Sequence, residues 1–271
     1  TFGNIVTAMV TPFDYKGNID LAKTTQLVEH LIENGSDSLV VAGTTGESPT
    51  LSTEEKIALF QHVVKVVDGR AKIIAGTGSN NTYASIELTK RAEKIGVDGV
   101  LLVSPYYNKP NQQGLYEHFK AIADSTSLPV MLYNIPGRTA VTISIDTIVK
   151  LSEIPNIVAI KESTGDIAAA TEIISKTDDQ FMLYSGDDYM TLPFLSIGAK
   201  GVVSVASHII GNEMQEMITA YQQGEHMKAA QLHQQLMPIM NGLFIAPNPT
   251  PVKTALQMKG MDVGSVRLPL V

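Results

Sequence analysis

The stretch Ile157-Val158-Ala159-Ile160-Lys161-Glu162 decides the fold class. Four aliphatic residues in a row predict a short strand, and the charged pair after them predicts its end. A strand with one face in water would alternate apolar and polar residues. A run that is apolar on both faces therefore predicts a strand covered on both sides, as in a parallel sheet flanked by helices.

Seven other apolar runs of strand length occur along the chain, and the eight runs start about 28 residues apart, the length of one βα unit. The other seven runs are residues 5–10, 39–41, 73–75, 100–103, 130–133, 181–184 and 202–205. Eight strands in strict alternation with helices favour a (β/α)8 TIM barrel, an α/β fold, over an open doubly wound sheet. The turn Thr11-Pro12-Phe13-Asp14 also lacks the GxGxxG pattern that such an open sheet carries when it binds a dinucleotide.

Helix signals lie between the runs. Ser52 and Glu55 form a capping box, Gly96 ends a predicted helix over 82–95, and Asp166 precedes another. After the eighth run, residues 213–221, 225–241 and 250–259 predict additional helices. We expect a barrel over residues 1–210 and a C-terminal helical extension over 211–271, packed on the barrel as part of a single structural domain.

Composition excludes several classes of protein. The net charge of −7 argues against a nucleic-acid or membrane-surface binder, because both need a basic face. The chain has no cysteine, which excludes disulfides, thiolate metal sites and cysteine nucleophiles. No apolar run approaches the ~20 residues that span a bilayer, and no secretory signal pattern opens the chain. A soluble cytoplasmic protein is expected.

Lys161 is the most informative candidate, because function in such barrels gathers at the carboxyl ends of the strands. A period of two places Lys161 on the face of Ile157 and Ala159, which points into the barrel. Burial disfavours the charged ammonium, and a neutral amine can attack a ketone. The alternative is a lysine that forms an ion pair with Glu162 or another carboxylate at the rim.

Two more candidates follow the fifth run. Tyr133 ends that strand as Lys161 ends the next, so the two side chains are expected to be neighbours, with the phenol able to move protons; the alternative is a core tyrosine whose hydroxyl is satisfied. Arg138 lies in the Pro-Gly turn Pro136-Gly137-Arg138 and suits a carboxylate clamp, although a lone loop arginine more often forms a surface salt bridge.

The turn Gly43-Thr44-Thr45-Gly46-Glu47 follows the second strand. Its two glycines permit a tight turn that can leave amide N–H groups free to hold a carboxylate, with two hydroxyls beside them. Turns rich in threonine and glycine are common, so this pattern alone is a weak signal.

Three other patterns do not support a site. Gly76-Thr77-Gly78 is not followed by the Lys-Ser/Thr pair of a phosphate-binding loop. The six histidines show no metal-ligand spacing and are interpreted mostly as solvated helix residues. Asp187 and Asp188 suit a helix N-terminus better than a cation site, because adjacent carboxylates point apart on extended chain.

The chain resembles the dihydrodipicolinate synthase family, within the pyruvate-dependent class I aldolase superfamily, from about residue 3 to residue 270. The order and spacing of five motifs carry the resemblance. They are Gly43-Thr-Thr-Gly-Glu-Ser48, Ser104-Pro-Tyr-Tyr-Asn-Lys-Pro110, Leu132-Tyr-Asn-Ile-Pro-Gly-Arg138-Thr139, Ala159-Ile-Lys-Glu162 and Tyr184-Ser-Gly-Asp187.

The resemblance implies a lyase of lysine and diaminopimelate biosynthesis that condenses pyruvate with L-aspartate 4-semialdehyde to 4-hydroxy-tetrahydrodipicolinate, without metal or organic cofactor. Lys161 would form the Schiff base, and Tyr133, Thr44 and Tyr107 would relay protons, with Tyr107 reaching across a subunit contact. The residues expected to bind substrate are Thr45 and Val203 for pyruvate, Arg138 for the carboxylate of the aldehyde, and Gly186 as pocket lining.

Two alternatives stay open. The superfamily also contains N-acetylneuraminate lyases, which generally have serine in place of Thr44 and lack the arginine that matches Arg138. A second alternative is a non-catalytic barrel that senses a keto acid. The resemblance implies a homotetramer, with a dimer as the alternative, and the Tyr106-Tyr107 pair is compatible with an intersubunit contact.

Two departures from the family pattern lead to further expectations. Lysine-inhibited members carry His, His and Glu where this chain has Thr53, Lys56 and Ala84, so weak or absent feedback by lysine is expected. The chain also stops at residues 268–271, where the family usually continues into another helical segment, and this is expected to affect helix packing and assembly.

Overall fold

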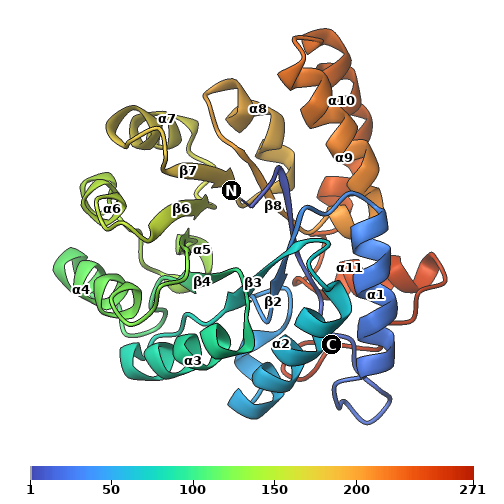
Figure 1. Ribbon diagram of the computed structural model, residues 1–271. Coiled ribbons are helices and arrows are strands. Elements are labelled where there is room, and N and C mark those ends of the chain that lie inside the picture. Colours follow the sequence, from blue (N-terminus) through green and yellow to red (C-terminus); the bar gives the residue numbers. More distant parts are fainter. Residues whose placement is uncertain (1) are drawn as a thin grey trace. The chain divides into compact units, whose positions relative to one another are not determined.

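The computed structural model describes residues 2–271 and confirms the predicted (β/α)8 barrel with additional C-terminal helices. Eight parallel strands follow one another in chain order around a closed barrel, with helices between them (Figure 1). The strands are β1 (Ile5–Ala8), β2 (Ser38–Val41), β3 (Lys72–Gly76), β4 (Gly99–Val103), β5 (Val130–Asn134), β6 (Ile157–Glu162), β7 (Met182–Ser185) and β8 (Gly201–Ser204).

The described chain divides into two compact units. One unit joins the residues up to Ile73 with Val203–Val271, and the other is Ile74–Val202. The helices of the first unit are α1 (Leu21–Glu33), the 3-10 turn η1 (Ser48–Thr50), α2 (Thr53–Val67), α9 (Ser207–Gln222), α10 (His226–Gly242) and α11 (Thr250–Met258).

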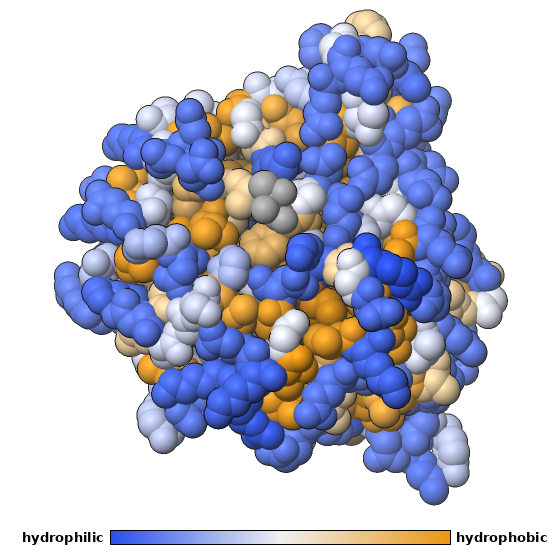
Figure 2. Space-filling model, in the orientation of Figure 1, coloured by the Kyte–Doolittle hydropathy of each residue, from blue (hydrophilic) through white to orange (hydrophobic). Residues whose placement is uncertain are grey.

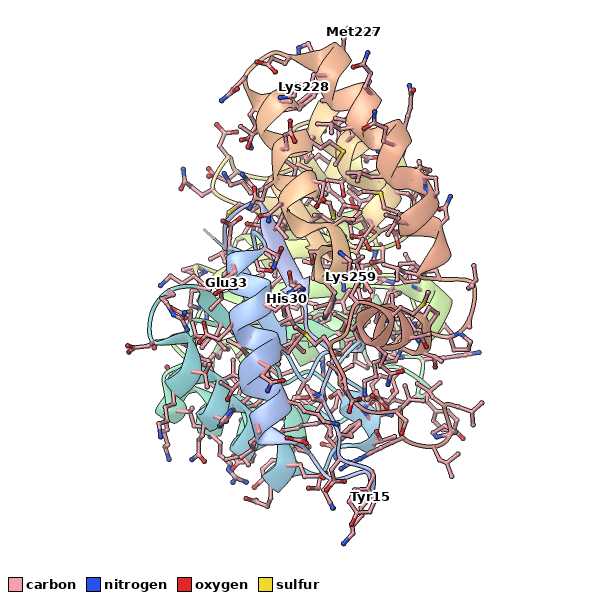
Figure 3. The ribbon with its side chains drawn as sticks, turned by 90° about the vertical axis from the view of Figure 1, so that its right-hand side faces the viewer. Tyr15, His30, Glu33, Met227, Lys228 and Lys259 are labelled. Atoms are coloured by element: carbon pink, nitrogen blue, oxygen red, sulfur yellow. The ribbon has the colours of Figure 1, made fainter. Side chains whose placement is uncertain are left out.

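Helix α9 organises the first unit, because it packs against α1, α10, α11 and β1. Two side chains join neighbouring elements to its first turns: the ring of His30 bonds the carbonyl of His208, and Lys259 Nζ donates to the carbonyl of Ile209 at 3.0 Å (Figure 3). Helix α10, at the upper right of Figure 2, shows mainly hydrophilic residues on the face in view. The N- and C-terminal parts of the chain are therefore interleaved within this unit.

The second unit carries the consecutive strand pairs β4–β5, β5–β6 and β6–β7, all in parallel register. Neighbouring helices pack in the same sequence, α3 on α4, α4 on α6, α6 on α7 and α7 on α8. The helices are α3 (Thr82–Ile95), α4 (Gln112–Ala123), α5 (Pro136–Thr139), α6 (Ile145–Ser152), α7 (Ile167–Lys176), η2 (Asp188–Met190) and α8 (Thr191–Ser196).

Local signals in the sequence are confirmed in several places. Ser52 and Glu55 form both hydrogen bonds of a capping box, Gly96 ends α3 in a left-handed conformation, and Asp166 caps α7. The residues after the fifth strand form the one-turn helix α5 where the sequence indicated only a Pro-Gly turn. Helix α9 begins at Ser207, earlier than residue 213, because a first turn precedes a kink at Ile210.

Over residues 2–271, every helix is too short or too polar to cross a lipid bilayer.

Candidate active site

Lys161 lies within β6 and is buried, with 6% of its surface exposed. Strand β6 extends to Glu162, so Lys161 lies inside the strand and not in the loop after it. Its register partners are Tyr133 on β5 and Tyr184 on β7. The sequence therefore predicted correctly both the burial of this amine and its closest strand neighbour.

The Lys161 amine faces the ring of Tyr133. Its Nζ lies 4.0 Å from the ring centroid, and Tyr133 is also buried, with 4% exposed. Within the described residues 2–271, no carboxylate lies within ion-pair distance of Lys161, so the alternative of a rim salt bridge with Glu162 is not what the structure shows. An amine without a carboxylate partner is placed to act as a nucleophile once it has lost its proton.

Glu162 points into a network of its own. The amide Nδ2 of Asn134 and the backbone N–H of Thr164 donate to its two carboxylate oxygens, both at 2.9 Å. Burial is the main cause that raises the pKa of Glu162, and these hydrogen bonds act in the opposite direction. Asn134 also accepts from the N–H of Ile143 at 3.1 Å, so Glu162 ties the end of β6 to the segment after β5.

Gly186 follows β7 and lies against Lys161. A Cβ at this position would overlap the hydroxyl of Ser163 and stand 3.1 Å from Cε of Lys161. A side chain at Gly186 would therefore collide first with Ser163 and would also crowd Lys161. Ser163 Oγ is buried and has no hydrogen-bond partner among residues 2–271.

Asp187 directly follows Gly186 in the sequence. Burial raises the pKa of Asp187, and the charge of Lys161 acts in the opposite direction. Asp187 stands at the N-cap of η2 and Asp188 in its first turn, as predicted for a helix N-terminus, although the side chain of Asp187 makes no capping hydrogen bond.

Arg138 and Tyr107 have exposed side chains. Arg138 lies on α5, and its guanidinium makes no ion pair or hydrogen bond with any residue that the structure describes, so the surface salt bridge considered above is not observed. Tyr107 follows β4, is 88% exposed and has a left-handed backbone with φ 75°. Both side chains are available to a ligand or to another molecule.

Thr44, Thr45 and Val203 belong to the first unit. Val203 is buried in β8, and Thr45 is 3% exposed in the turn after β2. A Cβ at Gly46 would stand 3.1 Å from the carbonyl oxygen of Met9, so the turn leaves little room for a side chain there. The backbone N–H of Thr45 donates to no acceptor among residues 2–271, as the sequence led us to expect for this turn.

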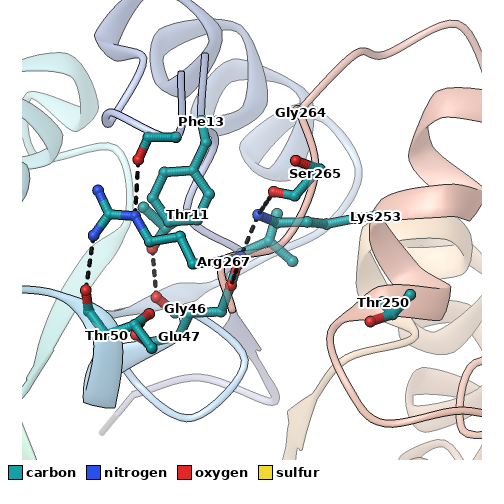
Figure 4. Close-up of polar contacts among 12 residues, drawn as sticks. Thr11, Phe13, Gly46, Glu47, Thr50, Thr250, Lys253, Gly264, Ser265 and Arg267 are labelled. Carbon is teal, nitrogen blue, oxygen red and sulfur yellow. Dashed lines mark hydrogen bonds and ion pairs between the residues drawn. The ribbon is translucent and has the colours of Figure 1, made fainter. Parts of the chain in front are cut away.

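The same turn is anchored by residues that the sequence did not indicate. Glu47 forms a buried ion pair with Lys253 of α11 at 2.7 Å, and the backbone N–H of Arg267 donates to its other oxygen at 2.7 Å (Figure 4). Lys253 Nζ and the Arg267 guanidinium lie 4.2 and 4.4 Å from the centroid of the Phe13 ring. Asn248, just before α11, donates to the hydroxyl of Thr45 at 2.9 Å.

The histidines differ in part from their interpretation as solvated residues. His208 is fully buried, accepts from the N–H of Val10 at 3.2 Å, and has a pKa that burial lowers to about 4. His118 is also buried, and burial lowers its pKa to about 4. Helix-like spacing alone did not show that these two positions face the interior.

Comparison with known proteins identifies the family. The model of the dihydrodipicolinate synthetase family matches residues 1–271. The chain belongs to this family. It is 65% identical over 271 residues to the 4-hydroxy-tetrahydrodipicolinate synthase of Bacillus subtilis, covering 100% of this chain and 93% of that protein. It is also 65% identical over 269 residues to the synthase of the same name from Bacillus velezensis, covering 99% and 93%.

Solved structures of the family agree with the fold. A dihydrodipicolinate synthase from Bacillus anthracis has a TM-score of 0.99 and 68% identity, covering 100% of this chain and 93% of that one. The synthase of Cyanidioschyzon merolae, solved with lysine bound, has a TM-score of 0.98 and 49% identity, covering 100% and 92%. The family resemblance inferred from the sequence motifs is thereby confirmed.

Proposed function

We propose that the chain is a lyase that condenses pyruvate with L-aspartate 4-semialdehyde to 4-hydroxy-tetrahydrodipicolinate, as the family's name implies. One observation carries the proposal beyond family membership: the buried amine of Lys161 faces the Tyr133 ring and is not neutralised by a carboxylate partner. The product places the reaction in lysine and diaminopimelate biosynthesis.

The reaction begins at Lys161. Its neutral amine adds to the keto carbon of pyruvate and loses water, which gives an imine. The protonated imine nitrogen then accepts electron density when the methyl group loses a proton, so an enamine forms. Lysine itself supplies the electron sink in this scheme.

The enamine carbon attacks the aldehyde carbon of aspartate semialdehyde, which forms a carbon–carbon bond and a hydroxyl group. The amine of the substrate next adds to the imine carbon and displaces Lys161, which closes the six-membered ring and regenerates the free amine. Every step is an addition, an elimination or a proton transfer, so no external oxidant or reductant is consumed.

In this scheme the protons are transferred by Tyr133, Thr44 and Tyr107. The position of Tyr133 beside Lys161 supports its part. The exposure of Tyr107 is compatible with a contribution to the site of a second copy of the chain. A homotetramer with this arrangement, or a dimer, and a cytoplasmic location are parts of the same proposal.

Binding of the two substrates is assigned to separate groups. Thr45, with its hydroxyl and free N–H, and the main chain of Val203 would hold pyruvate. Arg138 would hold the carboxylate of the aldehyde substrate, because an unpaired guanidinium forms bidentate hydrogen bonds with carboxylates. Gly186 would keep the space beside Lys161 open.

Borohydride reduction tests the central step. With pyruvate present, the protein is expected to gain the mass of one reduced pyruvate adduct, and peptide mapping is expected to locate it on Lys161. A K161A variant is the control and should gain nothing. An unmodified wild-type chain would contradict the proposal and favour a non-catalytic keto-acid sensor.

A second experiment identifies the aldehyde partner. With pyruvate in excess, aspartate semialdehyde is expected to be consumed and N-acetylmannosamine is not. The opposite preference would favour a sialic acid lyase.

A further inference from the structure

We propose that Asn248 is a positioning residue that commits the hydroxyl of Thr45 to act as a hydrogen-bond donor toward the carboxylate of the keto acid. This inference rests on the proposed function, in which Thr45 holds pyruvate. Asn248 lies just before α11, far from the turn in sequence, and none of the motifs that carry the family resemblance includes it.

The contact itself is buried and has a direction. The Nδ2 group of Asn248 donates to Oγ1 of Thr45 at 2.9 Å, and the two residues are 6% and 3% exposed. A hydroxyl has one proton and two lone pairs, so a hydroxyl oxygen that already accepts from an amide keeps its proton for another acceptor. No residue within 2–271 accepts that proton.

Thr45 consequently presents two donors, its hydroxyl and its backbone N–H, to an incoming group. A carboxylate can accept both, and hydrogen bonds to a charged acceptor are stronger than those between neutral groups. If the amide of Asn248 were turned around, its oxygen would take up the Thr45 proton and leave the hydroxyl as an acceptor that repels a carboxylate. The orientation of one amide thus decides whether this turn attracts the substrate.

The surroundings hold both partners of this hydrogen bond in place. On the side of the turn, Thr11 Oγ1 donates to the carbonyl of Gly46 at 2.7 Å, and Glu47 has a left-handed backbone with φ 58°. On the side of Asn248, Lys253 in the following helix forms the buried ion pair with Glu47. The ion pair therefore connects the two segments at a second point and restrains their relative movement.

The orphaned oxygen of the amide supports a functional role. Oδ1 of Asn248 is buried and has no hydrogen-bond partner among residues 2–271. A buried amide that served only packing would be replaced at little cost by an apolar residue, whereas an unpaired acceptor carries a desolvation penalty. The donor end of Asn248 is accordingly the part that the site needs.

The test replaces Asn248 by aspartate, which has nearly the same shape but accepts where the amide donated. We expect N248D to raise the KM for pyruvate roughly 10- to 100-fold, the effect of losing one hydrogen bond to a charged group. The KM for aspartate semialdehyde should change less than about twofold. N248A removes the donor without adding a charge and is expected to raise the pyruvate KM by a smaller factor, so it provides the measurement if N248D does not fold.

A double-mutant comparison decides whether Asn248 acts through Thr45. In a T45A background, N248D and N248A are each expected to add less than about a twofold change in the pyruvate KM, because the hydroxyl they would misdirect is absent. N156D serves as a matched control: Asn156 donates to the carbonyls of Ala123, Thr126 and Leu128 in the other unit, so its replacement should lower the melting temperature and leave the pyruvate KM unchanged.

A pyruvate KM for N248D or N248A within twofold of the wild type would overturn the inference, and so would an equal increase in the T45A background. Borohydride trapping of the wild type separates this failure from failure of the proposed function. Labelling of Lys161 together with an unchanged KM refutes only the role of Asn248. Absence of labelling refutes the proposed function and the inference with it.

Discussion

Nζ of Lys161 lies 4.0 Å from the ring centroid of Tyr133, its register partner on the neighbouring strand. The ring lies beside the amine, and in the proposed function its hydroxyl transfers protons while water is lost and the imine forms. We therefore expect Y133F to lower kcat by about 100-fold or more, the usual contribution of a positioned acid–base group. The ring stays in place, so borohydride should still trap pyruvate on Lys161, only more slowly. A Y133F enzyme with wild-type turnover would contradict this role.

Arg138 provides a test of substrate selectivity. R138A is expected to raise the KM for aspartate semialdehyde roughly 10- to 100-fold, because a hydrogen-bonded charge pair is lost, and to leave the KM for pyruvate unchanged. The KM of R138K for aspartate semialdehyde should stay nearly as high as that of R138A, since an ammonium cannot form the bidentate contact. R70A is a suitable control, because Arg70 forms an exposed pair with Glu29 and should leave both constants unchanged. Equal effects of R138A on both substrates would argue against the assignment.

Glu162 predicts a pH dependence of stability. Burial raises the pKa of this carboxyl in the folded state above its ordinary value of 4.5. Between the unfolded and the folded pKa the native state binds more protons, so the contribution of Glu162 to stability decreases as pH rises through that window. E162Q cannot ionise, and the difference in unfolding free energy between E162Q and wild type should shift in favour of E162Q as pH rises above 4.5. Urea denaturation followed by circular dichroism measures this, and a pH-independent difference would contradict it.

The buried pair Glu47–Lys253 predicts a large loss of stability. The two side chains are 2% and 3% exposed, and removing one partner leaves the other charge buried. We expect K253M to reduce the free energy of unfolding by about 3–5 kcal/mol, and E47Q/K253M to lose less than K253M alone. K228M is the control, since Lys228 forms exposed pairs worth at most about 1 kcal/mol. Equal losses in the free energy of unfolding for K253M and K228M would show that the buried pair does not stabilise the fold as proposed.

Feedback by lysine is expected to be weak. The family resemblance implies that Thr53, Lys56 and Ala84 stand where lysine-inhibited members carry two histidines and a glutamate, so a lysine site there would lack a carboxylate for an ammonium group and carry an added cation. The K56H/A84E variant should be more sensitive to lysine than the wild type. Half-inhibition of the wild type at sub-millimolar lysine in an activity assay would refute this expectation.

The fold and the Lys161–Tyr133 part of the site could be predicted from the sequence, because both follow from short-range periodicity. Eight apolar runs at the spacing of βα units indicate the barrel, and a period of two places Lys161 on the inner face. Consecutive strands are neighbours in such a barrel, so Tyr133 was expected beside Lys161, and the register confirms it.

The contacts that anchor the Thr45 turn could not be predicted in this way. Glu47 and Arg267 are 220 positions apart, and no local pattern relates two residues across that distance. The burial of His208 was missed for a similar reason, because its partner Val10 lies 198 positions earlier. The division into a barrel over 1–210 and a helical extension over 211–271 stays a prediction.

The long separation between Glu47 and Arg267 has a consequence for how the protein is made. At roughly 5–20 residues per second, the ribosome needs about 10–40 s to synthesise the chain between them. During that interval the threonine turn has been translated but lacks the partners that anchor it, and its acidic side chain is still in water. If the threonine turn holds the keto acid as proposed, this part of the site is completed late, after most of the polypeptide has left the exit tunnel.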